Sequence, residues 1–189
     1  MAPDFAVYYL TQPSGLAFQM ALVLIPLILL RIIAPVAFAR IGFRRMAFGH
    51  AAVAVVTFAL AFIEALSLGL SKVALGHVPA SETASWIAGT SVYMFVLMYI
   101  FTLTFASLIV APLTVWLFKR NAQSLLTLAA VGCVTAVLIA SLAVAFPSNN
   151  WAESHPVQEF FAILSSSIGL GALLVPVAFG LGAQLPLRR

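Results

Sequence analysis

Residues 123–146 read QSLLTLAAVGCVTAVLIASLAVAF, without one charged side chain. At a rise of about 1.5 Å per residue, a helix of this length crosses the roughly 30 Å of hydrocarbon in a bilayer. Inside a bilayer the backbone must satisfy its own hydrogen bonds, as a helix or a closed barrel does. A barrel strand alternates apolar and polar residues, whereas Leu, Ala and Val run continuously here. The stretch therefore predicts a transmembrane helix in an all-α integral membrane protein.

Four more stretches of the chain have the same character. The chain is 63% hydrophobic and 7% charged, with a mean hydropathy of +1.14, whereas soluble domains carry about 25% charged residues. Before the first stretch, Phe5, Tyr8 and Tyr9 favour the headgroup layer. We therefore expect an interfacial segment, residues 1–15, and a single bundle of five transmembrane helices, residues 16–189. The expected spans cover residues 16–38, 46–71, 85–118, 123–146 and 157–183.

Prolines mark places where three of these spans can bend, because proline has no N–H to give to the helix. Pro26 and Pro35 fall in the first span, Pro112 in the third and Pro176 in the fifth. The third span is also longer than a bilayer requires, so we expect it to tilt, bend near Pro112 or protrude.

The orientation follows from the basic residues, which concentrate in cytoplasmic loops of membrane proteins. Lys72 alone lies in a loop on one side, and the acidic residues gather on that side or in the adjacent halves of spans. We expect the N-terminus outside, the C-terminus in the cytoplasm, and residence in a plasma membrane, specifically a bacterial inner membrane. The basic residues assigned to the cytoplasmic side are Arg40, Arg44, Arg45, Lys119, Arg120, Arg188 and Arg189.

The net charge of +4 does not indicate nucleic-acid binding, because the basic residues sit in short loops between apolar blocks rather than in one stripe. Five of them form a basic rim that favours anionic lipid headgroups, at about 1 kcal/mol for each residue near the surface. The rim comprises Arg40, Arg44, Arg45, Lys119 and Arg120.

Small residues predict where membrane helices pack closely. Lipid tails are as apolar as the helices, so helices associate mainly through close packing, and small side chains let their backbones approach. The fourth and fifth spans each carry such residues at spacings of three to four, so we expect these two spans to be tight antiparallel neighbours. The expected packing residues are Gly132, Ala136 and Ala140 in the fourth span, and Ser165, Gly169 and Ala172 in the fifth.

Arg31 and Glu64 are the two charges embedded in spans, and such charges are functional candidates. At about 1.5 Å per residue, they lie roughly 13 Å apart in depth, too far for a direct ion pair between straight helices. Arg31 can extend to the inner headgroups, and Glu64 lies near the outer interface. We favour two interface-seeking charges over a buried pair, with Glu64 the stronger functional candidate because a carboxylate cannot extend far.

No cofactor can be assigned from the sequence. His77, Glu153 and His155 are weak candidates for a metal site, since their spacing matches no ligand motif and solvated loops are the default interpretation. A haem held by two histidines needs a facing pair within the bundle, and His50 lies at the opposite end from the other two histidines.

Two function classes fit the pattern. We first expect a non-catalytic membrane subunit or scaffold that packs with other membrane proteins in a larger complex, because the loops are short and no motif is present. The alternative is a small permease or channel component that acts as a homo-oligomer, with Glu64 in the pathway. An enzyme is the weakest interpretation, because the serines at 165–167 lack any G-x-S-x-G context.

Overall fold

The computed structural model describes residues 12–122, 124–146 and 154–184, and these residues form helices joined by short turns, with no β-strand among them. The prediction of an all-α protein is therefore confirmed for the described residues. Of the predicted interfacial segment, residues 1–11 lie outside the description, and the first helix begins at Pro13.

The first predicted span is divided into two helices, α2 (Pro13–Ile33) and α3 (Pro35–Ile41). The break is at Ala34, whose φ of −132° and ψ of 59° leave the helical region, as expected for a residue whose conformation the following proline restricts. Helix α2 has 21 residues, and at about 1.5 Å per residue it is roughly as long as the hydrocarbon layer is thick.

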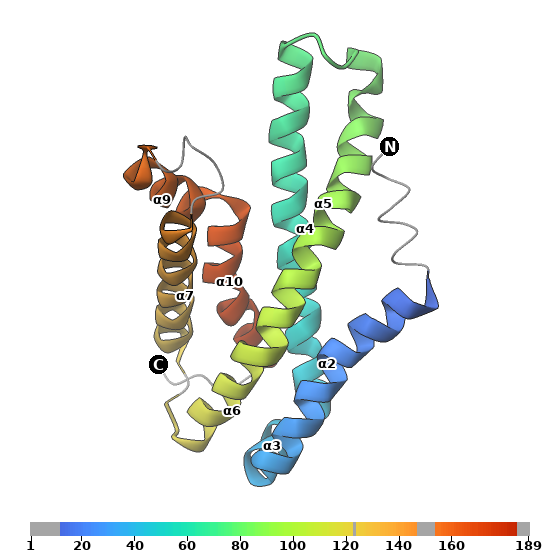
Figure 1. Cartoon of the computed structure of the whole chain (residues 1–189). Coiled ribbons are helices and arrows are strands. Elements are labelled where there is room, and N and C mark those ends of the chain that lie inside the picture. The colour runs from blue at the N-terminus through green and yellow to red at the C-terminus, as the bar shows by residue number, and fades with distance from the viewer. Residues whose placement is uncertain (1–11, 123, 147–153, 185–189) are drawn as a thin grey trace.

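The second and third stretches form long antiparallel helices at the centre of the molecule (Figure 1). Gly42, with a φ of +81°, turns the chain from α3 into α4 (Phe43–Ala74). The third stretch is one apolar helical run of 40 residues, Ala80–Lys119. Its segments are η1 (Ala80–Glu82), α5 (Thr83–Phe105), the π-helical η2 (Ala106–Val110) and α6 (Ala111–Lys119).

The π-helical turn η2 lies directly before Pro112. Because Pro112 cannot donate a hydrogen bond to the preceding turn, the helix widens there instead of ending. The predicted irregularity near Pro112 thus takes the form of a π-turn.

The last two stretches form α7 (Leu125–Ala145), α9 (Pro156–Ser165) and α10 (Ser167–Gly182). The fifth predicted span is broken, since α9 and α10 meet at an angle of 47°. The described residues thus contain three helices long and apolar enough to cross a membrane, or four if the bent pair is one span. This supports a multi-pass membrane protein.

The buried core lies toward one end of the bundle, which we call the basic end. The α3–α4 junction and the α6–α7 turn, which carry the five rim residues, both lie there, at the bottom of Figure 1. Helix α10 packs against α4 on one side and α7 on the other. Phe179 of α10 is fully buried against Gly49 of α4 and meets His50 edge-on, with 5.2 Å between ring centroids.

Candidate functional site

Three polar residues, His50, Thr57 and Glu64, follow one another along α4 at intervals of seven residues. Because seven residues make almost two helical turns, they share one face of the helix. His50 has its partner on η2 and Thr57 has its partner on α5. Helices α4 and α5 form the most extensive helix pair among the described residues. The chain therefore carries a polar stripe through an otherwise apolar interface.

His50, at the basic end of the stripe, has both ring nitrogens in hydrogen bonds. Nδ1 lies 2.9 Å from the carbonyl oxygen of Met46, which can only accept, so Nδ1 carries the proton. Nε2 then accepts from the hydroxyl of Ser107 in η2, at 3.2 Å. The side chain is 6% exposed, and this pairing removes the cost of burying it.

Thr57, in the middle of the stripe, is fully buried and also satisfied. Its hydroxyl donates to the carbonyl oxygen of Val53 at 2.8 Å and lies 2.9 Å from Oγ1 of Thr102. The Thr102 hydroxyl also lies 3.3 Å from the carbonyl oxygen of Tyr99, so its proton is shared between Tyr99 and Thr57. His50 and Thr57 are therefore both hydrogen-bonded to the helical run beside α4.

Glu64, at the far end of the stripe, is different. The residue is half-buried, and its Oε2 atom is buried without a hydrogen-bond partner. A buried polar atom without a partner is costly, and a buried carboxylate more so. Among the described residues, Oγ1 of Thr114 in α6 is also buried without a partner. Glu64 differs from Thr114 because its side chain is ionisable, and this marks Glu64 as the candidate for an additional partner.

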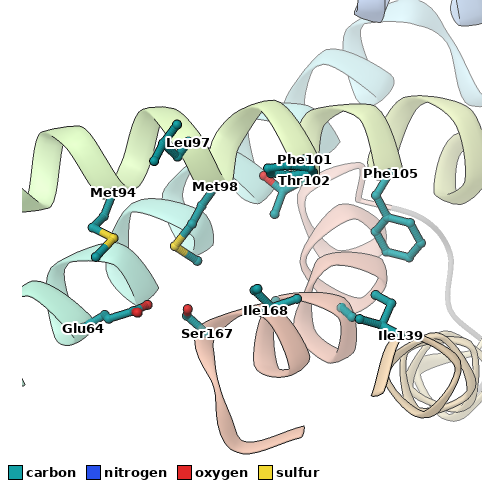
Figure 2. Close-up of a pocket in the computed structure, with 12 residues that line it drawn as sticks. Glu64, Met94, Leu97, Met98, Phe101, Thr102, Phe105, Ile139, Ser167 and Ile168 are labelled. Atoms are coloured by element: carbon teal, nitrogen blue, oxygen red, sulfur yellow. The ribbon is translucent and has the colours of Figure 1, made fainter. Parts of the chain in front are cut away.

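The Glu64 carboxylate lines a cavity of about 540 Å³ between α4, α5, α7 and α10. Figure 2 shows the carboxylate and the Ser167 hydroxyl pointing toward one another, with Met94 and Met98 of α5 beside them. Apart from Glu64, Ser167 and Thr102, the lining is apolar. The remaining lining residues are Met94, Leu97, Met98, Phe101, Phe105, Ile139, Ile168, Gly171 and Ala172.

The break between α9 and α10 places the start of α10 at this cavity. Ser166 is extended, with a ψ of 167°, and its hydroxyl donates to the carbonyl oxygen of Ile163 at 2.7 Å. The hydroxyl oxygen of Ser166 also caps α10 by accepting a hydrogen bond from the N–H of Gly169. At Gly169 a Cβ atom would meet the carbonyl oxygens of Ile163 and Leu164. The bend therefore depends on glycine at 169, and the positive end of the α10 dipole faces the same space as Glu64.

Arg31, the other embedded charge, is exposed on α2 and does not line this cavity. The Glu64 Oε2 atom has no partner, so no hydrogen bond joins it to Arg31. The structure thus leaves the two charges separate, in agreement with their different depths.

Two of the three residues proposed for a metal site, His77 and His155, lie among the described residues. His77 is exposed after α4, and His155 is exposed at the start of α9. Glu153 lies outside the described residues. Among the described residues no cluster of three or more His, Cys, Asp or Glu side chains could hold a metal ion.

The small residues of α7 lie at its contact with α10. Gly132, Ala136 and Ala140 are buried, and a Cβ atom at Gly132 would meet the backbone of Leu173. On the other helix, Ala172 is buried and lines the cavity.

The other two residues expected to pack are found at the helix break. Gly169 is buried there, and Ser165 is exposed with its hydroxyl turned back to the carbonyl oxygens of Phe161 and Ala162.

The five residues of the basic rim are exposed. Two of them lie over aromatic rings of their own helices. The Arg44 guanidinium is 5.5 Å from the centroid of the Phe48 ring, and the Arg120 guanidinium is 4.8 Å from that of Trp116. These contacts hold the charges beside the apolar part of the bundle.

Sequence reasoning singled out Glu64 but missed its surroundings. The seven-residue spacing of His50, Thr57 and Glu64 is visible in the sequence and would have placed them on one face. The Met94–Met98 pair, four residues apart, carries a similar but weaker signal. The only sequence signal for the helix break at Ser166 is the run of three consecutive serines, whose hydroxyls compete with the backbone for hydrogen bonds.

Comparison of the chain with protein-family models, curated proteins and solved structures finds no match. The geometry around Glu64 is therefore the basis of the function proposed below.

Proposed function

We propose that this protein is a small permease or channel component that acts as a homo-oligomer, with Glu64 in the pathway of a cationic solute. The observation that supports this most is the buried, unpartnered Glu64 Oε2 atom at the wall of a cavity. A negative charge kept in an apolar setting, without a partner, is suited to a positively charged visitor.

The helix break supports a pathway but not the sign of the solute's charge. Many transporters build their binding sites where a membrane helix is interrupted, because the freed ends of the two half-helices face the solute. Here the break between α9 and α10 is at Ser166, and Ser167 lines the same cavity as Glu64. The N-terminus of α10 carries partial positive charge, so the cationic class rests on Glu64 alone.

Our proposal for the topology is five spans, with the N-terminus outside and the C-terminus in the cytoplasm of a bacterial inner membrane. It rests on the five rim residues, which share the basic end, and on the positive-inside rule. In this orientation the cavity lies toward the outer side, since Glu64 is fourteen positions beyond His50 on α4.

The non-catalytic membrane subunit, which we expected first from the sequence, is our second candidate here, and one observation favours it. Phe101 and Ile168, which line the cavity, are 75% and 55% exposed, so the cavity opens at the side of the bundle. A helix of a larger complex could close it there. In that case Glu64 would meet a donor on the partner rather than a solute.

Uptake into proteoliposomes under an inside-negative potential tests the proposal. The probes are protons, Na⁺, methylammonium and tetraethylammonium, and the variants are Glu64→Gln and Glu82→Gln. Glu82 is an exposed carboxylate in η1 outside the cavity, so its variant is the matched control. We expect the purified protein to form a homo-oligomer and at least one probe to enter in a manner that Glu64→Gln abolishes and Glu82→Gln leaves unchanged.

The opposite result would overturn the proposal. If no probe enters faster than in empty vesicles, and the protein co-purifies with another membrane protein in fixed ratio, the subunit interpretation replaces it.

A further inference from the structure

The cavity around Glu64 joins one charge to a large apolar lining, and this combination restricts what it can bind. Its volume of about 540 Å³ falls within the roughly 300–1,000 Å³ of small-molecule sites. A hydrated inorganic ion would leave most of this lining in contact with water. An occupant that matches the lining must therefore carry apolar surface of its own.

The charge of that occupant follows from Glu64. A carboxylate oxygen only accepts hydrogen bonds, and few donors are near it. The Thr102 hydroxyl is engaged by Thr57 and by the carbonyl oxygen of Tyr99, which leaves Ser167 as the hydroxyl that faces the carboxylate across the cavity (Figure 2). With this hydroxyl and the positive end of α10 nearby, the Glu64 Oε2 atom still has no hydrogen-bond partner, and a cation can pair with it.

The apolar wall of α5 is suited to a cation with an organic body. Met94 and Met98 are flexible and polarisable, and methionine is common on surfaces that accept ligands of varied shape. Phe101 and Phe105 continue this wall, and aromatic faces attract cations.

The opposite wall, on α10, is made of Ser167, Ile168, Gly171 and Ala172. A Cβ atom at Gly171 would lie 3.8 Å from Leu60 and 4.0 Å from Thr102, an ordinary contact distance, so α10 packs against α4 and α5 at this residue. The room for a ligand is the cavity of about 540 Å³ beside this contact.

We propose that this cavity binds a lipophilic organic cation, with its positive centre at the Glu64 carboxylate and its apolar body between the α5 wall and the start of α10. This inference names the solute class of the function proposed above and rests on it. It also predicts a binding property that can be measured without transport.

Equilibrium binding of tetraphenylphosphonium to the purified protein in a non-ionic detergent tests the inference. Triphenylphosphine oxide, a neutral molecule with similar rings, serves as the matched ligand. We expect saturable binding of the cation, weakened about 10-fold or more by Glu64→Gln, since loss of one partner of a buried charge pair has at least this effect. Glu82→Gln should leave binding unchanged, and Glu64→Asp, which keeps the charge, should retain part of it.

Thermal unfolding gives a second readout that does not depend on activity. Tetraphenylphosphonium should raise the unfolding midpoint of the unmodified protein and of Glu82→Gln, but not of Glu64→Gln, because only a ligand bound to the folded state shifts the equilibrium. Equal effects on all three proteins would overturn the inference.

Two other outcomes would also overturn it. Equal binding of the neutral and the cationic ligand would show an apolar slot for lipid chains. Displacement of tetraphenylphosphonium by phosphatidylethanolamine at comparable concentration would assign the charge to a lipid amine.

Failure of the inference is distinguishable from failure of the proposed function, since Glu64-dependent uptake of Na⁺ or protons without tetraphenylphosphonium binding would remove only the solute class. Binding without uptake of any probe would remove only transport.

Discussion

The two halves of α10 meet their neighbours in opposite ways. The half toward the basic end is closely packed, with Val175 and Phe179 fully buried and Gly180 placed so that a Cβ atom would meet Leu128. The half toward the helix break carries Ser167 and Gly171, which line the cavity. One helix thus belongs to both a complete core and an incomplete site.

The polar groups beside each half show the same difference. His50, next to Phe179, has a partner on each ring nitrogen, while Glu64, across from Ser167, has a buried oxygen without one. A half-buried carboxylate with one unpartnered oxygen adds no stability to a membrane bundle. Thr114 Oγ1, on α6 at the basic end, is also buried without a partner, but it belongs to a neutral hydroxyl. The two ends of the bundle therefore differ in that the unpartnered group at the cavity end is ionisable and lines a cavity.

The contact between α7 and the middle of α10 offers the sharpest way to break the packed side. At Gly132 even a Cβ atom would meet the backbone of Leu173, which cannot rotate away. We expect Gly132→Leu to force the two helices apart and to cost more than about 3 kcal/mol, beyond the usual range for overpacking. The measurement is the thermal unfolding midpoint in mild detergent. Leu126→Ala, at a side chain that is 82% exposed on the same helix, is the control and should change little.

Equal midpoints for Gly132→Leu and Leu126→Ala would mean that α7 and α10 are not in close contact.

Two phenylalanines allow the packed and open sides to be compared with one chemistry. Phe179 is fully buried in the core, and Phe101 is 75% exposed at the cavity wall. Phe179→Ala should cost about 2–3 kcal/mol in free energy of unfolding. This is below the range for soluble cores, because an apolar side chain that leaves the packed bundle enters lipid rather than water. Phe101→Ala should stay within about 0.5 kcal/mol, as exposed substitutions do. Similar losses in the unfolding midpoint would remove the distinction between the two sides.

The sequence was sufficient for the helical class, because hydropathy over twenty residues is a local property that tertiary contacts do not change. It placed the helix of 123–146 within two residues of α7, Leu125–Ala145. It was less informative about interruptions. Of the four prolines expected to bend helices, Pro26 and Pro176 lie inside continuous helices, and the 47° break of the fifth span is at Ser166 instead.

The site was only partly predictable for a related reason. Glu64 stands out in an apolar stretch, but its lack of a partner depends on where α5 and α10 lie. The hydroxyls of the third stretch illustrate the point. Thr104 bonds to its own helix, at the carbonyl oxygen of Ile100, whereas Ser107 reaches across to His50. Nothing in the local sequence separates these two outcomes.

Ser107 and Thr104 form a pair that tests the closed hydrogen bonds of the basic end. Ser107→Ala should leave Nε2 of His50 buried without a donor, at a cost of about 1–2 kcal/mol. Thr104→Ala removes a hydroxyl that is satisfied within its own helix and should cost less than about 0.5 kcal/mol. The midpoints of the two variants decide the matter. No difference between them would indicate that His50 finds another partner, such as water.

The smallest expected effect on stability, and the one with the opposite sign, belongs to Glu64. Replacing a buried unpaired charge with an apolar group of similar size is often neutral or stabilising. We therefore expect Glu64→Leu to leave the ligand-free unfolding midpoint unchanged or raised, by no more than about 1 kcal/mol, while tetraphenylphosphonium binding is lost. Such a variant would be at least as stable as the unmodified protein and would not bind the cation. If instead Glu64→Leu lowered the midpoint as much as Ser107→Ala, the carboxylate would have a structural partner in the assembled protein. The cavity end would then be as complete as the basic end, and the difference between the halves of α10 would carry no functional meaning.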